Sequence, residues 1–201
     1  MERVLDLGSH PLVGRVVALE PLAPSHYAPL AEASNDPGLW QFMPFDGAGA
    51  AFAAMWQAAE AEVARGERIA YAVRRLSDQA IVGSTSYLAI APAHGRVEIG
   101  ATWLTRDAQG SAVNPAAKRL LLAHAFEACR YHRVELKCDA RNLRSRAAIA
   151  KLGATEEGTL RGHMWVHKGY WRDTVYYSLL AEEWPAAKAA LDARLARFDM
   201  P

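Results

Sequence analysis

The turn Gln109-Gly110-Ser111-Ala112-Val113-Asn114 lies between an expected strand and a long expected helix. The first backbone N–H groups of a helix lack carbonyl partners and can bind an anion, and the helix dipole adds a favourable partial positive charge. Because glycine and small side chains let a phosphate approach the backbone, these residues predict a phosphate-binding loop. A glycine that only permits a tight turn would give the same pattern. The chain contains neither GxGxxG nor GxxxxGK[ST], so the nucleotide folds that use those motifs are not indicated.

The elements around this turn alternate between strand and helix patterns. Before the turn we expect a strand over 14–22, a helix beginning at Pro24-Ser25, a helix over 46–66, and strands over 69–76, 80–91 and 96–104. After it we expect a helix from Val113, a strand over 134–138, a helix over 145–152, strands over 164–167 and 174–180, and a closing amphipathic helix. With no internal repeat or linker, this order predicts one α/β domain over residues 1–201 with a mixed sheet flanked by helices.

Bulk composition restricts the partners. The 201 residues carry a formal net charge of +1, so no global field attracts nucleic acid or an anionic membrane, and an anionic ligand must be bound locally. The two cysteines are too few for a disulfide framework. The start MERVLDLGSH has no signal-peptide pattern, and no apolar run approaches the roughly 18 residues of a membrane span. We therefore expect a cytoplasmic protein that binds neither nucleic acid nor membrane.

Four segments occur in a fixed order: EIGATWL, QGSAVNPAAKRLLLAHAFE, RVELKCDARNLRSRAAIAKLGATEEGTLR and WRDTVYYSLLAEEW. Together they resemble the RimJ/RimL-like branch of the GNAT superfamily of N-acetyltransferases, over roughly residues 12–197. The resemblance implies the GNAT fold, an α/β (α+β) domain whose central mixed, mostly antiparallel sheet of about seven strands is flanked by helices. It also implies an enzyme that transfers an acetyl group from acetyl-CoA directly to a primary amine, either a protein N-terminal α-amine or a small-molecule amine.

The resemblance assigns the cofactor, acetyl-CoA or coenzyme A, to specific positions. Its pyrophosphate would lie on the backbone of Gln109, Gly110, Ser111, Ala112, Val113 and Asn114. Its pantetheine arm would run beside Trp103, Leu104 and Thr105 and bond to Asn142. The superfamily pattern Q/R-x-x-G-x-G/A falls on Asp107, Gly110 and Ala112, so its first position is acidic here, and Gln109 is the better polar contributor.

Transfer from a thioester to an amine needs oxyanion stabilisation and a proton for a departing thiol of pKa about 8.5. A backbone N–H near Trp103 to Thr105, free where the strand stops pairing, is the expected oxyanion donor. Many GNAT enzymes carry a tyrosine seven residues after the asparagine, but Ile149 stands there. Ser145 lies one turn earlier on the same helix face, and the RimL-like resemblance implies that it is the acid. Ser145 could also cap that helix.

Glu98 is the expected general base, because its strand precedes the cofactor loop and can direct a carboxylate toward the acceptor. Strand alternation predicts that Glu98, Gly100 and Thr102 share a face opposite Trp103. A solvent-facing or salt-bridged Glu98 is the alternative. An amine that loses its proton in bulk water would need no base.

Several aromatic and basic residues could line the substrate or cofactor. Trp40 and Phe42 belong to an aromatic connection that suits either a pocket wall or the core, and His163 and Trp165 could line an amine pocket. Arg141, Arg144 and Arg146 could meet coenzyme A phosphates or lie on a solvated surface. His163 and His167 cannot share a metal, because residues four apart in a strand are about 13 Å from each other, so we predict no metal site.

The sequence leaves three readings open. The first is the acetyltransferase. The second is a non-catalytic module that binds or senses acetyl-CoA. The absence of the usual tyrosine is the reason to retain this alternative. The third is a structural partner that forms a homodimer through the last strand and the closing helix.

Overall fold

The structure is a computed structural model that describes residues 6–198; residues 1–5, which begin the segment MERVLDLGSH, and residues 199–201 lie outside it. The strands are β1 (Leu12–Val13), β2 (Val17–Pro21), β3 (Ile69–Arg75), β4 (Ile81–Ala91), β5 (Arg96–Leu104), β6 (Arg133–Asp139), β7 (Thr155–Val166) and β8 (Tyr170–Leu180). The α-helices are α1 (Tyr27–Ala33), α2 (Ala51–Ala64), α3 (Val113–Ala123), α4 (Leu143–Ala150) and α5 (Trp184–Ala196). A π-helical turn, His124–Ala128, extends α3.

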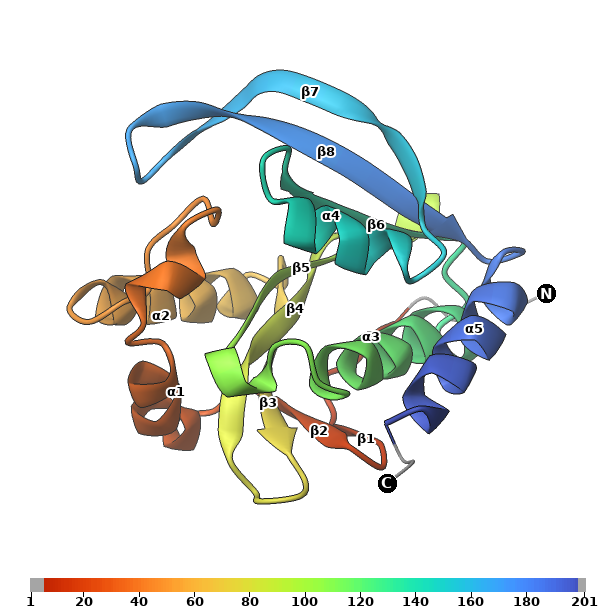
Figure 1. The fold of residues 1–201 in the computed structure, drawn as a ribbon, viewed down its shortest axis with the longest axis horizontal. Helices are drawn as coiled ribbons and strands as arrows, with labels where there is room; N and C mark the ends of the chain where they lie inside the picture. The colour runs from red at the N-terminus through yellow and green to blue at the C-terminus, as the bar shows by residue number, and fades with distance from the viewer. Residues whose placement is uncertain (1–5, 199–201) are drawn as a thin grey trace.

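The strands form one sheet in the order β1-β2-β3-β4-β5-β6-β8-β7. Every neighbouring pair is antiparallel except β5 and β6, which are parallel. A parallel pair needs a long crossover, and α3 with its π turn supplies it (Figure 1). The mixed, mostly antiparallel sheet confirms the expected fold, with eight strands rather than about seven.

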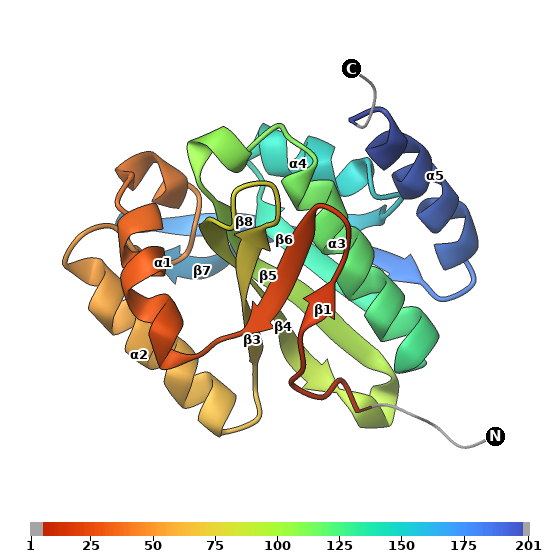
Figure 2. The ribbon, with the colours of Figure 1, turned by 90° about the horizontal axis from the view of Figure 1, so that it is seen from below.

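Helices cover both faces of the sheet. Helices α1 and α2 lie on one side of the strands, and α3 and α5 lie on the other (Figure 2). The larger core includes Leu121 of α3, Ile99 of β5 and Leu191 of α5, and a smaller core joins Trp40 and Phe52 to Trp103 of β5. Strand β5 therefore contributes side chains to both cores, and it lies at the centre of the molecule.

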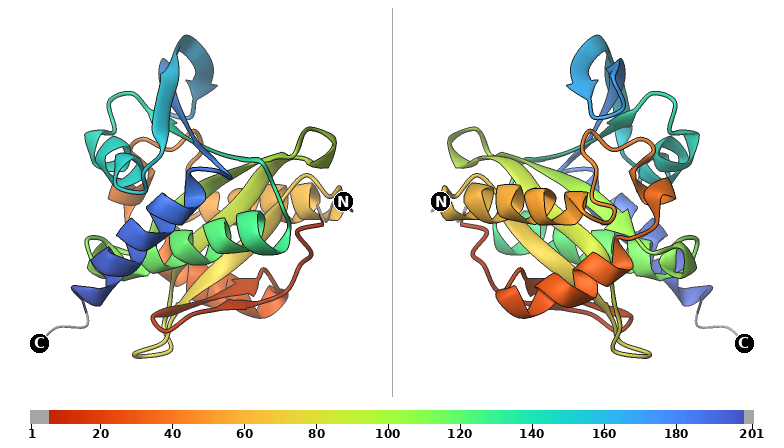
Figure 3. Two further views of the ribbon diagram at one scale, coloured as in Figure 1. Left: turned by 90° about the vertical axis from the view of Figure 1, so that its right-hand side faces the viewer. Right: turned by 90° about the vertical axis from the view of Figure 1, so that its left-hand side faces the viewer.

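The main departures from the expected elements have local causes. Helix α2 begins at Ala51 rather than at residue 46, because the Asp46 carboxylate accepts hydrogen bonds from the N–H groups of Gly47 and Ala48 and holds a turn there. Strand β7 begins at Thr155, well before the expected Met164. Its residues from Thr155 to Gly162 are all exposed, so no apolar alternation marks them as a strand. The β7–β8 hairpin extends beyond the body of the molecule (Figure 3).

Candidate active site

Strands β5 and β6 pair over only part of their length. Their parallel register runs from Arg96 opposite Arg133 to Glu98 opposite Glu135 and ends there. Both strands continue, β5 to Leu104 and β6 to Asp139, without pairing to each other. We call the region between 99–104 of β5 and 136–139 of β6 the β5–β6 split. An unpaired strand edge offers backbone N–H and C=O groups to a ligand.

A β-bulge lies in β5 beside the split. Ser86 pairs with Gly100 but Ser84 pairs with Trp103, so two residues of β5 stand opposite Thr85. Ala101 has φ +48°, a left-handed conformation that is uncommon for a residue other than glycine. The bulge inverts the side-chain alternation. Thr102 therefore contacts Lys118 of α3, whereas Trp103 packs against Trp40, and the expectation that Thr102 shares a face with Glu98 is wrong.

Backbone direction decides which N–H groups face the split. The Thr105 N–H donates to the Val82 carbonyl at 2.8 Å, so it points toward β4 and is not free. Because successive N–H groups of a regular strand point to opposite edges, that of Leu104 points to the split. The Leu104 carbonyl also faces that edge, where it accepts a hydrogen bond from the Gln109 amide at 2.8 Å. Of the expected oxyanion donors, Leu104 has a suitable direction.

The loop after β5 presents free donors, as its residue types predict. Among residues 6–198, the backbone N–H groups of Gly110, Ser111 and Ala112 have no hydrogen-bond partner. Gly110 has φ +77°, and a Cβ built there would meet no atom within 4 Å, so the backbone borders open space. The Ser111 hydroxyl accepts from the Val113 N–H at 3.2 Å, and α3 begins at Val113. Consecutive free N–H groups at a helix start suit a phosphate.

The three arginines after β6 have separate partners. Arg144 donates to the Gln109 side-chain oxygen and thereby connects α4 to the loop over 109–112. Arg141 forms an ion pair with Asp139 at 2.9 Å, and Arg146 forms one with Glu156 at 3.1 Å. Only Arg144 lies beside the loop, so the structure does not gather the cluster around it.

Helix α4 carries the next expected residues. The Asn142 side-chain oxygen accepts from the Ser145 N–H at 3.0 Å, so Asn142, and not Ser145, is the N-cap. The Asn142 amide nitrogen has no partner among residues 6–198 and can donate to a ligand. Burial raises the pKa of the Cys138 thiol, and the adjacent Ser145 hydroxyl opposes that rise, which places Ser145 against β6 at the split. Ile149 is 6% exposed and belongs to the core.

Glu98 is buried and paired. It is 3% exposed, and its carboxylate lies 2.8 Å from the Lys137 ammonium of β6. The salt-bridged alternative is thus the geometry observed.

Lys118 of α3 was not expected at the site. It is 6% exposed, and its ammonium donates to the Thr102 hydroxyl, which in turn bonds to Thr85. Burial lowers the pKa of Lys118 to about 7, and Glu98 opposes that change. The available signal was helical spacing, because Lys118 lies three residues before the buried Leu121 on the inward face of α3.

The four expected substrate-pocket residues have different neighbours. Trp40 is 0% exposed and packs between Trp103 and Phe45, so it belongs to the smaller core. Phe42 lies 5.9 Å from the Arg141 guanidinium, and the His163 ring lies 5.7 Å from that of Tyr176 on β8. Trp165 is 59% exposed and contacts Trp171 on the hairpin.

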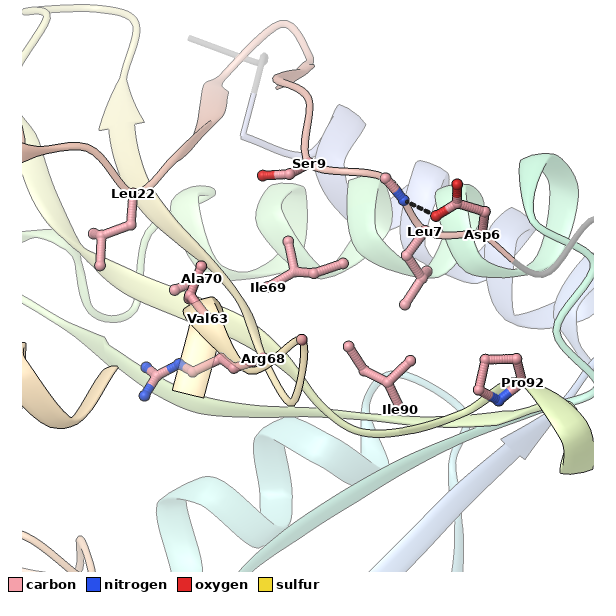
Figure 4. A pocket seen from close by; sticks show the side chains of 12 residues that line it. Asp6, Leu7, Ser9, Leu22, Val63, Arg68, Ile69, Ala70, Ile90 and Pro92 are labelled. Carbon is pink, nitrogen blue, oxygen red and sulfur yellow. Dashed lines mark hydrogen bonds between the residues drawn. The ribbon is translucent and has the colours of Figure 1, made fainter. Parts of the chain in front are cut away.

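Two cavities lie away from the split. One of about 670 Å³ is lined by Leu7, Ile69, Ile90 and Pro92, whose side chains surround it in Figure 4. It lies near the end of β4 that pairs with the start of β5, whereas the split lies beside the other half of β5. The second, of about 500 Å³, lies between the α1–α2 connection and the hairpin, where Phe45 and Met55 face Trp165. Neither cavity is lined by residues 109–112.

Residues 17–155 match the acetyltransferase (GNAT) domain family, and the chain belongs to that family. No helix among residues 6–198 is long and apolar enough to cross a membrane.

Individual relatives agree with this assignment. A Bacillus subtilis (strain 168) protein named as a candidate ribosomal N-acetyltransferase, YdaF, is 34% identical over 113 residues, which are 56% of this chain and 61% of that protein. A crystal structure of a candidate acetyltransferase from T. thermophilus is 38% identical, with a TM-score of 0.83 and coverage of 92% of this chain and 97% of that chain. Mycobacterium smegmatis RimJ in complex with CoA-disulfide is 27% identical, with a TM-score of 0.76 and coverage of 92% of both chains.

Proposed function

We propose that this chain is an acetyl-CoA-dependent N-acetyltransferase that transfers an acetyl group directly to a primary amine. The observation that carries the proposal is the β5–β6 split, which ends at a loop with three consecutive free N–H groups. The GNAT family membership and the relative named for ribosomal N-acetylation support the same activity and a protein N-terminal α-amine as one acceptor class.

The residues fit acetyl-CoA by their chemistry. The N–H groups of Gly110, Ser111 and Ala112 would hold the pyrophosphate, and the open space beside Gly110 would admit it. The unpaired edge of β5 and the Asn142 amide would bond to the amide groups of the pantetheine arm. When bound, acetyl-CoA supplies an acetyl group activated as a thioester.

The remaining roles fall to side chains and backbone around the split. The N–H group of Leu104 would stabilise negative charge on the acetyl oxygen. Ser145, which is not needed as the helix cap, would donate a proton to the departing sulfur. Glu98 would accept the proton of the amine once its contact with Lys137 weakens.

Two measurements test the proposal. Thermal unfolding with and without acetyl-CoA tests binding, and a ligand at 100 times its Kd should stabilise the fold by about 2.7 kcal/mol, or roughly 5–10 °C. Release of free thiol against a panel of peptides and small amines tests turnover. Ser111→Asp should abolish the thermal shift by charge repulsion, while Ser111→Asn, of the same shape but neutral, controls for the lost Ser111 hydrogen bonds.

The outcomes separate the readings. A thermal shift together with thiol release supports the enzyme. A shift without thiol release from any amine supports a non-catalytic acetyl-CoA-binding module, which the apolar Ile149 would suit. No shift at hundreds of micromolar acetyl-CoA would refute both.

A further inference from the structure

Arg172 on β8 is a buried cation without an anionic partner. Its side chain is 4% exposed, and its Nε donates to the Thr174 hydroxyl at 3.1 Å. Among residues 6–198, no carboxylate lies within 4.0 Å of its guanidinium, and its other N–H groups have no acceptor. Burying an unpaired charge is costly, so such a group usually has a partner, in the protein or in a ligand.

Strand register places Arg172 on the face of the sheet that carries Glu98. Asp139 and Lys137 of β6 lie opposite Thr174 and Tyr176 of β8, and cross-strand partners point to the same side. Arg172 precedes Thr174 by two residues and bonds to it, so it shares that side. The Glu98–Lys137 ion pair adds β5 to the same face. We call this set the charged face: Glu98, Lys137, Asp139, Arg141, Arg172 and His163.

The charged face has more positive than negative groups. Lys137 neutralises Glu98 at 2.8 Å, and Arg141 neutralises Asp139 at 2.9 Å. Arg172 is then the positive group of this set that has no paired carboxylate, although the whole chain carries a formal charge of only +1. Burial lowers the pKa of Arg172, and Asp139 and Glu98 oppose that change. The excess charge is therefore local.

A second polar group on this face also lacks a partner. His163 Nδ1 is fully buried and forms no hydrogen bond with residues 6–198, although its ring contacts Tyr176. Burial lowers the pKa of His163, as do Lys137 and Arg172, so the neutral ring is favoured. A neutral imidazole can donate or accept one hydrogen bond there, beside an arginine with free donors.

We propose that Arg172 binds a carboxylate on the acceptor, so that the preferred acceptors are amines carrying a carboxylate close to the amino group. A guanidinium has a planar fork of donors that matches the two oxygens of a carboxylate. The carboxylate could be the α-carboxylate of a free amino acid or an acidic side chain near a peptide N-terminus. The coenzyme phosphates are a less suitable partner, because the free N–H groups that suit them lie in the loop after β5. This inference rests on the proposed acetyltransferase function.

Paired acceptors test it. Thiol release is measured with L-phenylalanine against L-phenylalaninamide, and with the peptide amides Ala-Glu-NH₂ against Ala-Gln-NH₂, so that the two pairs distinguish the two carboxylate sources. The kcat/KM of the wild type should favour the carboxylate member of at least one pair by about 10- to 100-fold, the effect of one charge-assisted hydrogen bond. Arg172→Gln should reduce that preference to within about twofold, with most of the loss in the kcat/KM for the carboxylate member.

Controls keep the outcomes distinct. Arg161→Gln removes an exposed arginine of β7 and should retain the preference. If Arg172→Gln does not fold, 3-phenylpropionate, which has the carboxylate but no amine, should inhibit the wild type competitively with the acceptor. Equal use of neutral and carboxylate amines by the wild type, or equal loss of both in folded Arg172→Gln, would overturn the assignment. Absence of thiol release from every amine would instead contradict the proposed function.

Discussion

The buried lysine of α3 gives a prediction about stability that needs no substrate. Lys118 has a pKa of about 7 in the folded protein against an ordinary value of 10.5, mainly because of burial. Between these two pH values the unfolded chain binds more protons than the folded chain, so the free energy of unfolding rises with pH. Below pH 7 the ammonium is charged in both states, and the cost of burying it is present in full.

The size of the effect follows from the two pKa values. The difference between 10.5 and about 7 is roughly 3.5 units, worth about 5 kcal/mol at about 1.4 kcal/mol per unit. From pH 7.5 to 9.5, two units within this interval, the contribution is about 2.7 kcal/mol. In Lys118→Met the side chain fills a similar volume without the charge. The wild type should therefore gain about 2–3 kcal/mol of unfolding free energy relative to Lys118→Met over this pH range.

Urea unfolding at a series of pH values measures this difference, with a reductant present for the two free cysteines. Comparing the two proteins cancels the titration of all other groups. Lys151→Met, which removes an exposed lysine at the end of α4, controls for the loss of a lysine as such. If the stability curves of the wild type and Lys118→Met run parallel from pH 7.5 to 9.5, Lys118 keeps its proton inside the fold and the reasoning is refuted.

Three further predictions concern the proposed site. Gly110→Ala should weaken acetyl-CoA binding by about tenfold, because φ +77° disfavours a side chain that would otherwise meet no atom; an unchanged Kd in calorimetry would contradict a role for this turn. Ser145→Ala should lower kcat by about 10²-fold at saturating substrate while the thermal shift with acetyl-CoA persists, and an unchanged kcat would exclude Ser145 as the acid. Glu98→Gln should remove the acidic limb of the pH–rate profile if Glu98 is the base. Since this change also leaves Lys137 without its partner, the double variant Glu98→Gln/Lys137→Met is the matched control, and recovery of activity in it would assign Glu98 a pairing role only.

The sequence predicts the elements well wherever side chains alternate or repeat with a clear period. Strand β5 begins and ends at the expected residues, and α3 begins at the expected Val113, because apolar residues mark both. The first half of β7 escapes prediction because its exposed residues are not selected by a core. Periodic apolar residues mark the segments that pack on a core. They do not mark a strand whose only support is its pairing with a neighbouring strand.

The site is predicted less completely, for two physical reasons. Gly110 could be identified because a tight turn requires a residue that tolerates a positive φ. Asn142 was implied only by the family resemblance, and the structure makes it the N-cap of α4, a position for which the sequence suggested Ser145. Lys137 and Arg172 could not, because their roles depend on which strands become neighbours: β6 lies between β5 and β8, an order that alternation alone does not specify. The sequence left Trp40 as either a pocket wall or a core residue, because it does not show which strand residue Trp40 packs against. In the structure Trp40 packs against Trp103 of β5 in the smaller core.

One backbone irregularity connects these features. Before the bulge at Ala101, β5 directs Glu98 toward the charged face, where acceptor recognition is proposed; after it, the same strand directs Thr102 toward Lys118 on the opposite face. In a regular strand Glu98 and Thr102 would share one face, and Trp103 would lose its place against Trp40. Gly83 fits this arrangement, since a Cβ there would lie 2.1 Å from the Trp103 carbonyl oxygen, so only glycine allows β4 to approach β5 at this point. The extra residue thus lets a single strand serve both cores while its free N–H groups remain directed to the split.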